Sequence, residues 1–171
     1  MSYPTRICQP ALERLFRQHP PASILAIGEA STETFDHWQR EQPHLRVTTV
    51  PCCDDMAARV QAAGKHDTAV VSGALEHLDQ AEAEQLIALL RDQVAQRLFV
   101  LLPIGNDWPG QRSHWSLTDM TALGLRQVAC FEHEGRPLHL YRFDLYDYKL
   151  TPDWLNPRFW ANPEMWDRAR W

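Results

Sequence analysis

The stretch His66-Asp67-Thr68-Ala69-Val70-Val71-Ser72-Gly73-Ala74-Leu75-Glu76-His77-Leu78 decides the fold. Its apolar, β-branched centre predicts a strand at residues 68–71 that is buried on both faces. The run stops at Ser72-Gly73, and a helix with an apolar face follows shortly after it. Asp79, with Glu82 three residues later, is the pattern of a capping box at the start of that helix. A buried strand followed closely by a helix is the unit from which parallel α/β sheets are built.

Similar patterns extend this unit in both directions. Continuous apolar or β-branched runs predict three more strands of the same sheet, at residues 23–27, 47–50 and 97–102. Helical spacing of apolar residues predicts helices at residues 11–18, 32–40, 55–63, 80–94 and 116–123. Two further strands, at residues 127–133 and 138–144, are joined by a turn at Glu134-Gly135-Arg136-Pro137. We therefore expect an α/β fold with an open, mostly parallel sheet that ends in an antiparallel hairpin.

Composition indicates one ordinary globular domain and excludes several functional classes. The 171 residues are 44% hydrophobic and 23% charged, which is typical of a folded chain. A net charge of −5 argues against nucleic acid as a partner, because phosphate binding needs a concentrated basic surface. The longest apolar run, residues 98–104, is too short to cross a bilayer, so no membrane role is expected.

The cysteines and the first residues of the chain predict the compartment. Cys8, Cys52, Cys53 and Cys130 show no metal-ligand spacing, and adjacent cysteines seldom form a disulfide without strain. We therefore expect no metal site, and we interpret the Cys52-Cys53 pair as ordinary small buried thiols. No apolar leader segment is visible near residue 1. These observations predict a cytoplasmic protein with reduced cysteines.

The stretch quoted first also resembles a motif of the class I S-adenosylmethionine-dependent methyltransferases. In that family an FDLVVVSEVLEHL-like run forms the fourth strand and leads into a helix. The resemblance covers residues 22–144 and implies a Rossmann-like fold, S-adenosylmethionine as the cofactor and methyl transfer as the activity. Only residues 51–68 separate the second predicted strand from Ala69, which leaves room for one helix and its connections. The third strand of the family pattern is therefore expected to be missing.

Other positions depart from the family pattern, and each departure affects cofactor binding. The family has a glycine-rich loop after the first strand, because a β-carbon there would block the cofactor. Gly28 matches its first glycine, but Ala30 and Thr32 stand where later glycines would be. Ala26 replaces an acidic residue ahead of the loop, and Pro51 follows the second strand where an acidic residue would bind the ribose. The resemblance therefore implies a degenerate cofactor site, with Gly28, Glu29, Ser31 and Ser72 as its remaining candidates.

Ligands of open parallel sheets bind beyond the carboxyl ends of the strands. That rule adds a substrate crevice formed by Asp107, Arg112, His114 and Trp115. Glu76 and His77 can act there as a general acid–base pair, or they can pair and pack locally without a catalytic role. Trp115 can contact a planar substrate or anchor its loop to the core.

Residues 145–171 differ from the rest of the chain and are interpreted as a Trp/Pro-rich extension of a domain formed by residues 1–144. An Asn-Pro-x-x-Trp unit occurs at residues 156–160 and again at 162–166. We do not expect this segment to remain exposed to solvent, because it contains too many aromatic residues. It packs on its own domain, or it forms a homo-oligomer or protein-partner interface through Trp154, Trp160, Trp166 and Trp171.

Two functional hypotheses follow from the sequence. In the first, the protein is methyltransferase-like with an eroded cofactor site, and it has a non-catalytic binding or interaction role or takes another ligand. In the second, it is an active S-adenosylmethionine-dependent methyltransferase of a small substrate. Methyl transfer needs little beyond positioning, so the absence of an acid–base motif does not separate the two.

Overall fold

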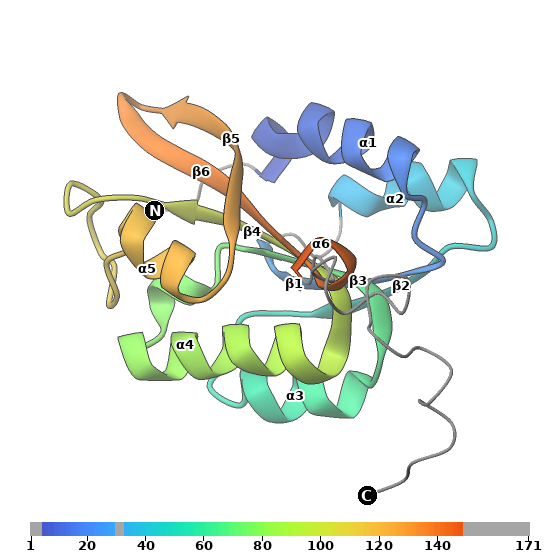
Figure 1. The fold of residues 1–171 in the computed structure, drawn as a ribbon, viewed down its shortest axis with the longest axis horizontal. Coiled ribbons are helices and arrows are strands. Elements are labelled where there is room, and N and C mark those ends of the chain that lie inside the picture. The colour runs from blue at the N-terminus through green and yellow to red at the C-terminus, as the bar shows by residue number, and fades with distance from the viewer. Residues whose placement is uncertain (1–4, 30–32, 149–171) are drawn as a thin grey trace, which may run out of the picture.

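A twisted sheet runs through the centre of the computed structural model, which describes residues 5–29 and 33–148 (Figure 1). Within these residues the sheet has six strands in the order β2-β1-β3-β4-β6-β5. The strands are β1 (Ser23–Gly28), β2 (Arg46–Val50), β3 (His66–Ser72), β4 (Ala95–Pro103), β5 (Arg126–His133) and β6 (Arg136–Asp144). The first four strands are mutually parallel, and β6 runs antiparallel to both β4 and β5. The predicted architecture is confirmed, including the absence of a strand between β2 and β3.

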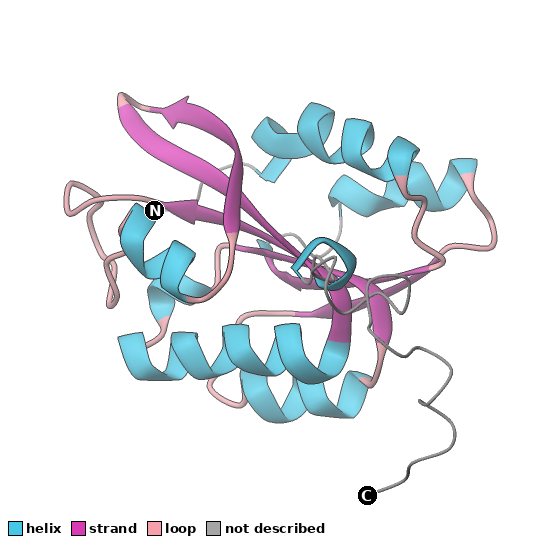
Figure 2. Cartoon of the chain, in the orientation of Figure 1, coloured by secondary structure: helices cyan, strands magenta, loops and turns pink. Residues whose placement is uncertain are grey.

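Helices cover both faces of the sheet (Figure 2). On one face lie α1 (Gln9–Gln18), which follows a 3-10 turn η1 (Thr5–Cys8), and α2 (Glu33–Glu41). On the other face lie α3 (Met56–Ala63), α4 (Gln80–Leu89) and α5 (Leu117–Ala122). The chain therefore forms three layers, with a core on each side of the sheet.

Alternation along β1 divides its side chains between these two cores. Leu25 and Ile27 pack with the helices α3 and α4, whereas Ile24 and Ala26 pack with α1 and α2. Every residue of β1 is buried. This explains why the strand is a continuous apolar run rather than an alternating one.

Two local elements differ from the sequence prediction. The helix predicted for residues 80–94 is α-helical only to Leu89 and ends in a π-helical turn, η4 (Leu90–Val94). The hairpin turn is shorter than expected, because Glu134 (φ 51°) and Gly135 (φ 75°) alone reverse the chain. A two-residue turn with positive φ at both positions matches the twist of the strands that it joins. Arg136 and Pro137 consequently belong to β6.

The described chain ends in α6 (Leu145–Tyr148), directly after β6. Residues 149–171, which include the four tryptophans of the predicted extension, lie outside the described residues. The two-part division of the chain therefore stays a prediction. In the portion that the structure describes, every helix is too short or too polar to cross a bilayer.

Candidate functional site

The switch point of the sheet lies between β1 and β3. Strand β1 pairs with β2 on one side and with β3 on the other, so the connections leave the two strands in opposite directions. Gly28, the last residue of β1, is the register partner of Ser72, the last residue of β3. In open α/β sheets the crevice beyond such a pair of strand ends is the usual ligand site.

The ends of β1 and β3 are in direct contact. Gly28 has a φ of +72°, and a β-carbon there would lie 2.3 Å from the carbonyl oxygen of Ser72 and 2.8 Å from Cβ of Ala74. Only glycine permits this approach, because it lacks a side chain and tolerates positive φ. The glycine that resembles a cofactor-loop residue thus serves here to bring two segments of the chain together.

The side chain of Glu29, the residue after Gly28, packs against Gly73. A β-carbon on Gly73 would lie 2.5 Å from Cγ and 2.8 Å from Cδ of Glu29. The space beside Gly73 is therefore filled by the side chain of Glu29. Beside it, the buried Ser72 Oγ is hydrogen-bonded to Thr5 Oγ1 at 3.0 Å. Residues from η1 and from the β1 loop together cover the turn that follows β3.

Glu76 and His77 lie in a short 3-10 helix, η3 (Leu75–His77), directly after this turn. Glu76 is only 3% exposed, and its backbone carbonyl accepts a hydrogen bond from the backbone N–H of Arg112 at 2.8 Å. His77 is half-buried. The structure therefore places both candidates at the switch point, although most of the surface of Glu76 is inaccessible to a substrate.

The loop after β2 approaches the same region. Burial raises the pKa of the Cys52 thiol, and the carboxylates of Glu76 and Glu29 raise it further. A raised pKa disfavours the thiolate form of Cys52. Cys52 and Cys53 are both free thiols, but Cys52 is exposed and Cys53 only partly buried, so the expectation of buried thiols is wrong. Within the described residues no cluster of His, Cys, Asp and Glu has a geometry that could hold a metal ion.

The long loop after β4 contains the four residues predicted for the substrate crevice, of which some are exposed and one is buried. Asp107, Arg112 and His114 are exposed, and Arg112 forms an ion pair with Asp79 at 2.8 Å. Trp115 is 1% exposed and belongs to the core with α4 and α5. Its position corresponds to the anchoring role rather than to contact with a substrate.

Ser113 organises the base of this loop, and it was not among the residues predicted for the site. Its hydroxyl donates to the carbonyl of Leu75 at 2.9 Å and accepts from the indole N–H of Trp115 at 3.0 Å. This chain of hydrogen bonds links η3 to the loop after β4. No motif marks a lone serine as such a link, so only the contact itself reveals it. Ser31, the remaining cofactor candidate, lies outside the described residues.

Several solved structures are similar to this fold. The small RNA methyltransferase HEN1 matches with a TM-score of 0.64 at 9% identity, over 82% of this chain and 25% of the other. An O-methyltransferase family protein from Burkholderia thailandensis matches at 0.55 and 14% identity, over 81% of this chain and 56% of the other. A third match is 1,6-didemethyltoxoflavin-N1-methyltransferase from the same organism, solved with S-adenosylhomocysteine bound. Its TM-score is 0.53 at 12% identity, over 78% of this chain and 75% of the other.

The chain therefore has the fold of the class I S-adenosylmethionine-dependent methyltransferases. It spans about half the length of the O-methyltransferase family protein and a quarter of HEN1. Residues 6–171 match the model of one protein family, described as a family of unknown function (DUF6231), and the chain belongs to that family. The match includes the tryptophan-rich C-terminal segment. No curated protein matches the chain.

Proposed function

We propose that this protein is a methyltransferase-like domain whose cofactor site is closed by its own side chains, and that it acts in binding or interaction rather than in methyl transfer. The contact of Glu29 with Gly73 carries the proposal. That contact places the Glu29 side chain against the turn after β3, at the switch point where a ligand of this fold class would enter. Glu29 comes from the β1 loop, the segment that admits the cofactor in the family.

Two further features support the same proposal. Pro51 follows β2 and offers no acceptor for ribose hydroxyl groups. The side chain of Thr5 bonds to Ser72, so a second segment also covers the end of β3. Each lost charge-assisted hydrogen bond to a cofactor costs about 1.5–3 kcal/mol, so several losses together reduce affinity by powers of ten.

The alternative is an active methyltransferase of a small substrate, and the fold of an enzyme solved with S-adenosylhomocysteine favours it. In that case Gly28, Glu29, Ser31 and Ser72 hold the cofactor. The exposed loop residues Asp107, Arg112 and His114 then face the substrate, with Glu76 and His77 as the acid–base pair. Glu29 would have to move away from Gly73 before the cofactor enters. A cytoplasmic location is part of both proposals.

Titration calorimetry and thermal shift of the full chain with S-adenosylmethionine and S-adenosylhomocysteine test the proposal. We expect no heat of binding and no stabilisation at millimolar concentrations of either compound. A dissociation constant tighter than about 10 μM, or about −7 kcal/mol, would overturn the closed-site proposal. The Glu29→Ala variant serves as the matched comparison. If only this variant binds S-adenosylhomocysteine, the carboxylate side chain is the group that closes the site.

A further inference from the structure

A cavity of about 480 Å³ lies at the opposite end of the strands from the candidate cofactor site. It lies where β3 and β4 begin, since His66 and Ala95 are the first residues of those strands and both line it. The candidate cofactor site lies beyond the other ends of the same strands. A volume of this size is in the range of cavities that hold a ligand or a large side chain.

The lining of this cavity combines apolar and cationic groups. Val94, Ala95 and Phe143 supply apolar surface and Lys65 supplies positive charge, while Arg91 is paired with Asp92, which also lines the cavity. The guanidinium carbon of Arg91 lies 5.8 Å from the centre of the Phe143 ring. Cations beside an apolar surface suit an aromatic occupant, because the face of an indole attracts a cation while its body buries apolar area.

Leu145, the first residue of α6, also lines the cavity. It is 48% exposed, and its neighbour Tyr146 is 66% exposed. Both side chains leave apolar surface uncovered beside the cavity. The described chain ends only three residues beyond Leu145, at Tyr148.

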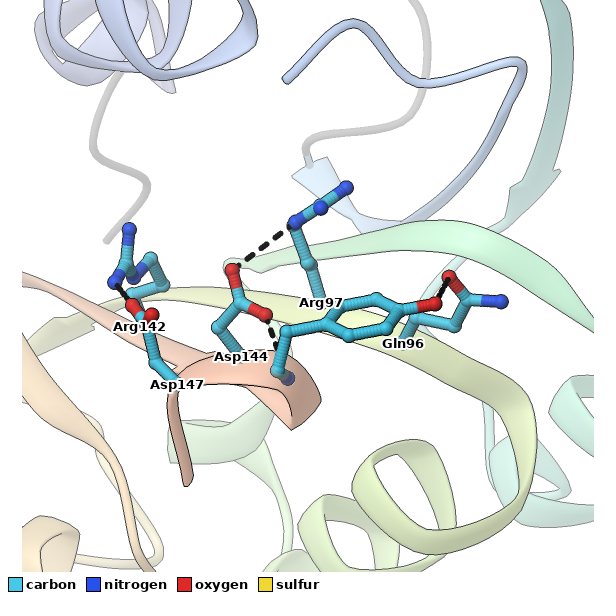
Figure 3. Close-up of polar contacts among 6 residues, drawn as sticks. Gln96, Arg97, Arg142, Asp144 and Asp147 are labelled. Carbon is cyan, nitrogen blue, oxygen red and sulfur yellow. Dashed lines mark hydrogen bonds and ion pairs between the residues drawn. The ribbon is translucent and has the colours of Figure 1, made fainter. Parts of the chain in front are cut away.

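Helix α6 is held in place by a set of polar contacts, so the point at which the chain continues is fixed (Figure 3). Asp144 binds Arg97 at 3.0 Å and accepts a hydrogen bond from the backbone N–H of Tyr146 at 3.0 Å. Tyr146 donates its hydroxyl to Gln96 at 3.3 Å, and Arg142 pairs with Asp147. Because Gln96 itself lines the cavity, the network ties α6 to the cavity wall.

We propose that the C-terminal segment of the same chain, residues 149–171, docks in this cavity and that Trp154 supplies the indole that enters it. Trp154 is the first tryptophan after α6, six residues beyond Tyr148. Six residues extend up to about 20 Å, whereas the four residues of α6 span only about 6 Å, so the indole can reach back to the cavity. A tethered segment also has an effective concentration of about millimolar, which favours it over a second molecule in dilute solution.

Photo-crosslinking of the full chain tests the occupant directly. With p-benzoylphenylalanine in place of Trp154, we expect cross-links within one chain to peptides that contain residues 91–96 or 143–145. Their yield is expected to be independent of protein concentration. The same group at the exposed position 107, beyond the other ends of the strands, is the control and should not label those peptides. Cross-linked dimers would show that the segment docks on a second copy and would overturn the proposal. Cross-links only to other peptides, or no cross-links at all, would overturn it as well.

Hydrogen exchange provides a second measurement that needs no modified residue. Trp154→Ala is expected to speed the exchange of protected amides in residues 91–96 about tenfold, because the cavity wall loses its cover. Trp154→Phe should restore most of the protection, and Trp171→Ala should leave these amides unchanged. Equal exchange in the wild type and Trp154→Ala would overturn the proposal. Neither experiment uses a cofactor, so their outcome is independent of the proposed function.

Discussion

Gly28 and Ser72 end adjacent parallel strands as register partners, and no side chain fits between them. A β-carbon on Gly28 would approach the Ser72 carbonyl oxygen to 2.3 Å. The atom that it would meet belongs to the backbone, which cannot turn aside as a side chain can. This contact holds the ends of β1 and β3 against each other.

Replacement of Gly28 by alanine is therefore expected to destabilise the protein by about 3 kcal/mol or more. Positive φ at a non-glycine residue costs about 1 kcal/mol, and the clash with Ser72 adds the rest. Gly110→Ala is the matched control, because Gly110 has a φ of +75° but no atom within 4 Å of the added carbon. We expect that variant to lose only about 1 kcal/mol in urea denaturation. Equal losses in the two variants would show that the contact with Ser72 contributes nothing.

The negative charge of Glu29 is expected to slow the alkylation of Cys52. Burial raises the pKa of that thiol, and the negative charges of Glu76 and Glu29 raise it further. Glu29→Gln removes one of these charges, lowers the pKa and increases the thiolate fraction at pH 8. We expect alkylation by iodoacetamide to become about twofold faster, measured by mass spectrometry in a Cys53→Ser background.

Glu132→Gln on β5 is the control for a general loss of negative charge and should leave the rate at Cys52 unchanged. An unchanged rate in Glu29→Gln as well would contradict the electrostatic link between the β1 loop and the loop after β2. High salt is expected to reduce the difference between the variants, because exposed charges are screened.

The sequence predicts the sheet well because its strands are continuous apolar runs. In β1, Ile24 and Ala26 face one core and Leu25 and Ile27 face the other, so both faces need apolar residues. The capping box at Asp79 and Glu82 was equally predictable, since it depends on residues three positions apart. The π-helical turn at Leu90–Val94 was not predicted, because the residues there continue the helical spacing of α4.

The candidate site was less predictable, because its shape depends on contacts between distant segments. Topology correctly places Gly28, Ser72 and Glu76 near one another. Nothing in the sequence indicates that Glu29 would lie against Gly73, or that Thr5 would bond to Ser72 across 67 residues. The burial of Trp115 was also not predictable, because the sequence does not indicate whether an aromatic residue in a loop points outward or into the core. Its burial follows from the chain of hydrogen bonds through Ser113.

Asp144 is expected to contribute strongly to stability, because its carboxylate makes two contacts while its side chain is only 5% exposed. Asp144→Ala leaves Arg97 without its anion and removes the acceptor at the start of α6, so we expect a loss of about 3 kcal/mol. Asp144→Asn keeps an acceptor for the Tyr146 N–H and should lose about half as much. The control is Asp92→Ala, which removes an exposed partner of Arg91 and should cost less than about 1 kcal/mol. Chemical denaturation measures all three, and a ranking in which Asp92→Ala equals Asp144→Ala would contradict the structure.

Tyr141 is expected to make the protein unstable in alkaline solution. Its side chain is fully buried, and burial, with a smaller effect of Cys130, raises the pKa of its hydroxyl from 10.0 to about 12. Between pH 10 and 12 the unfolded chain therefore loses this proton while the folded chain keeps it. The unfolded state then binds fewer protons, so the free energy of unfolding falls as pH rises through this window.

Tyr141→Phe removes the titrating hydroxyl and keeps the ring in the core. It also removes the hydrogen bond between the hydroxyl and His139 Nδ1, which are 3.2 Å apart. We expect the variant to be somewhat less stable than the wild type at pH 8 and to lose stability less steeply between pH 10 and 12. Cys8 is buried with a thiol pKa of about 12 and destabilises both proteins as pH rises above 9, so its effect cancels in the comparison. Urea denaturation at pH steps from 8 to 12 gives the two slopes. Parallel slopes would mean that the Tyr141 hydroxyl titrates alike in the folded and unfolded chains, and that burial does not hold its proton.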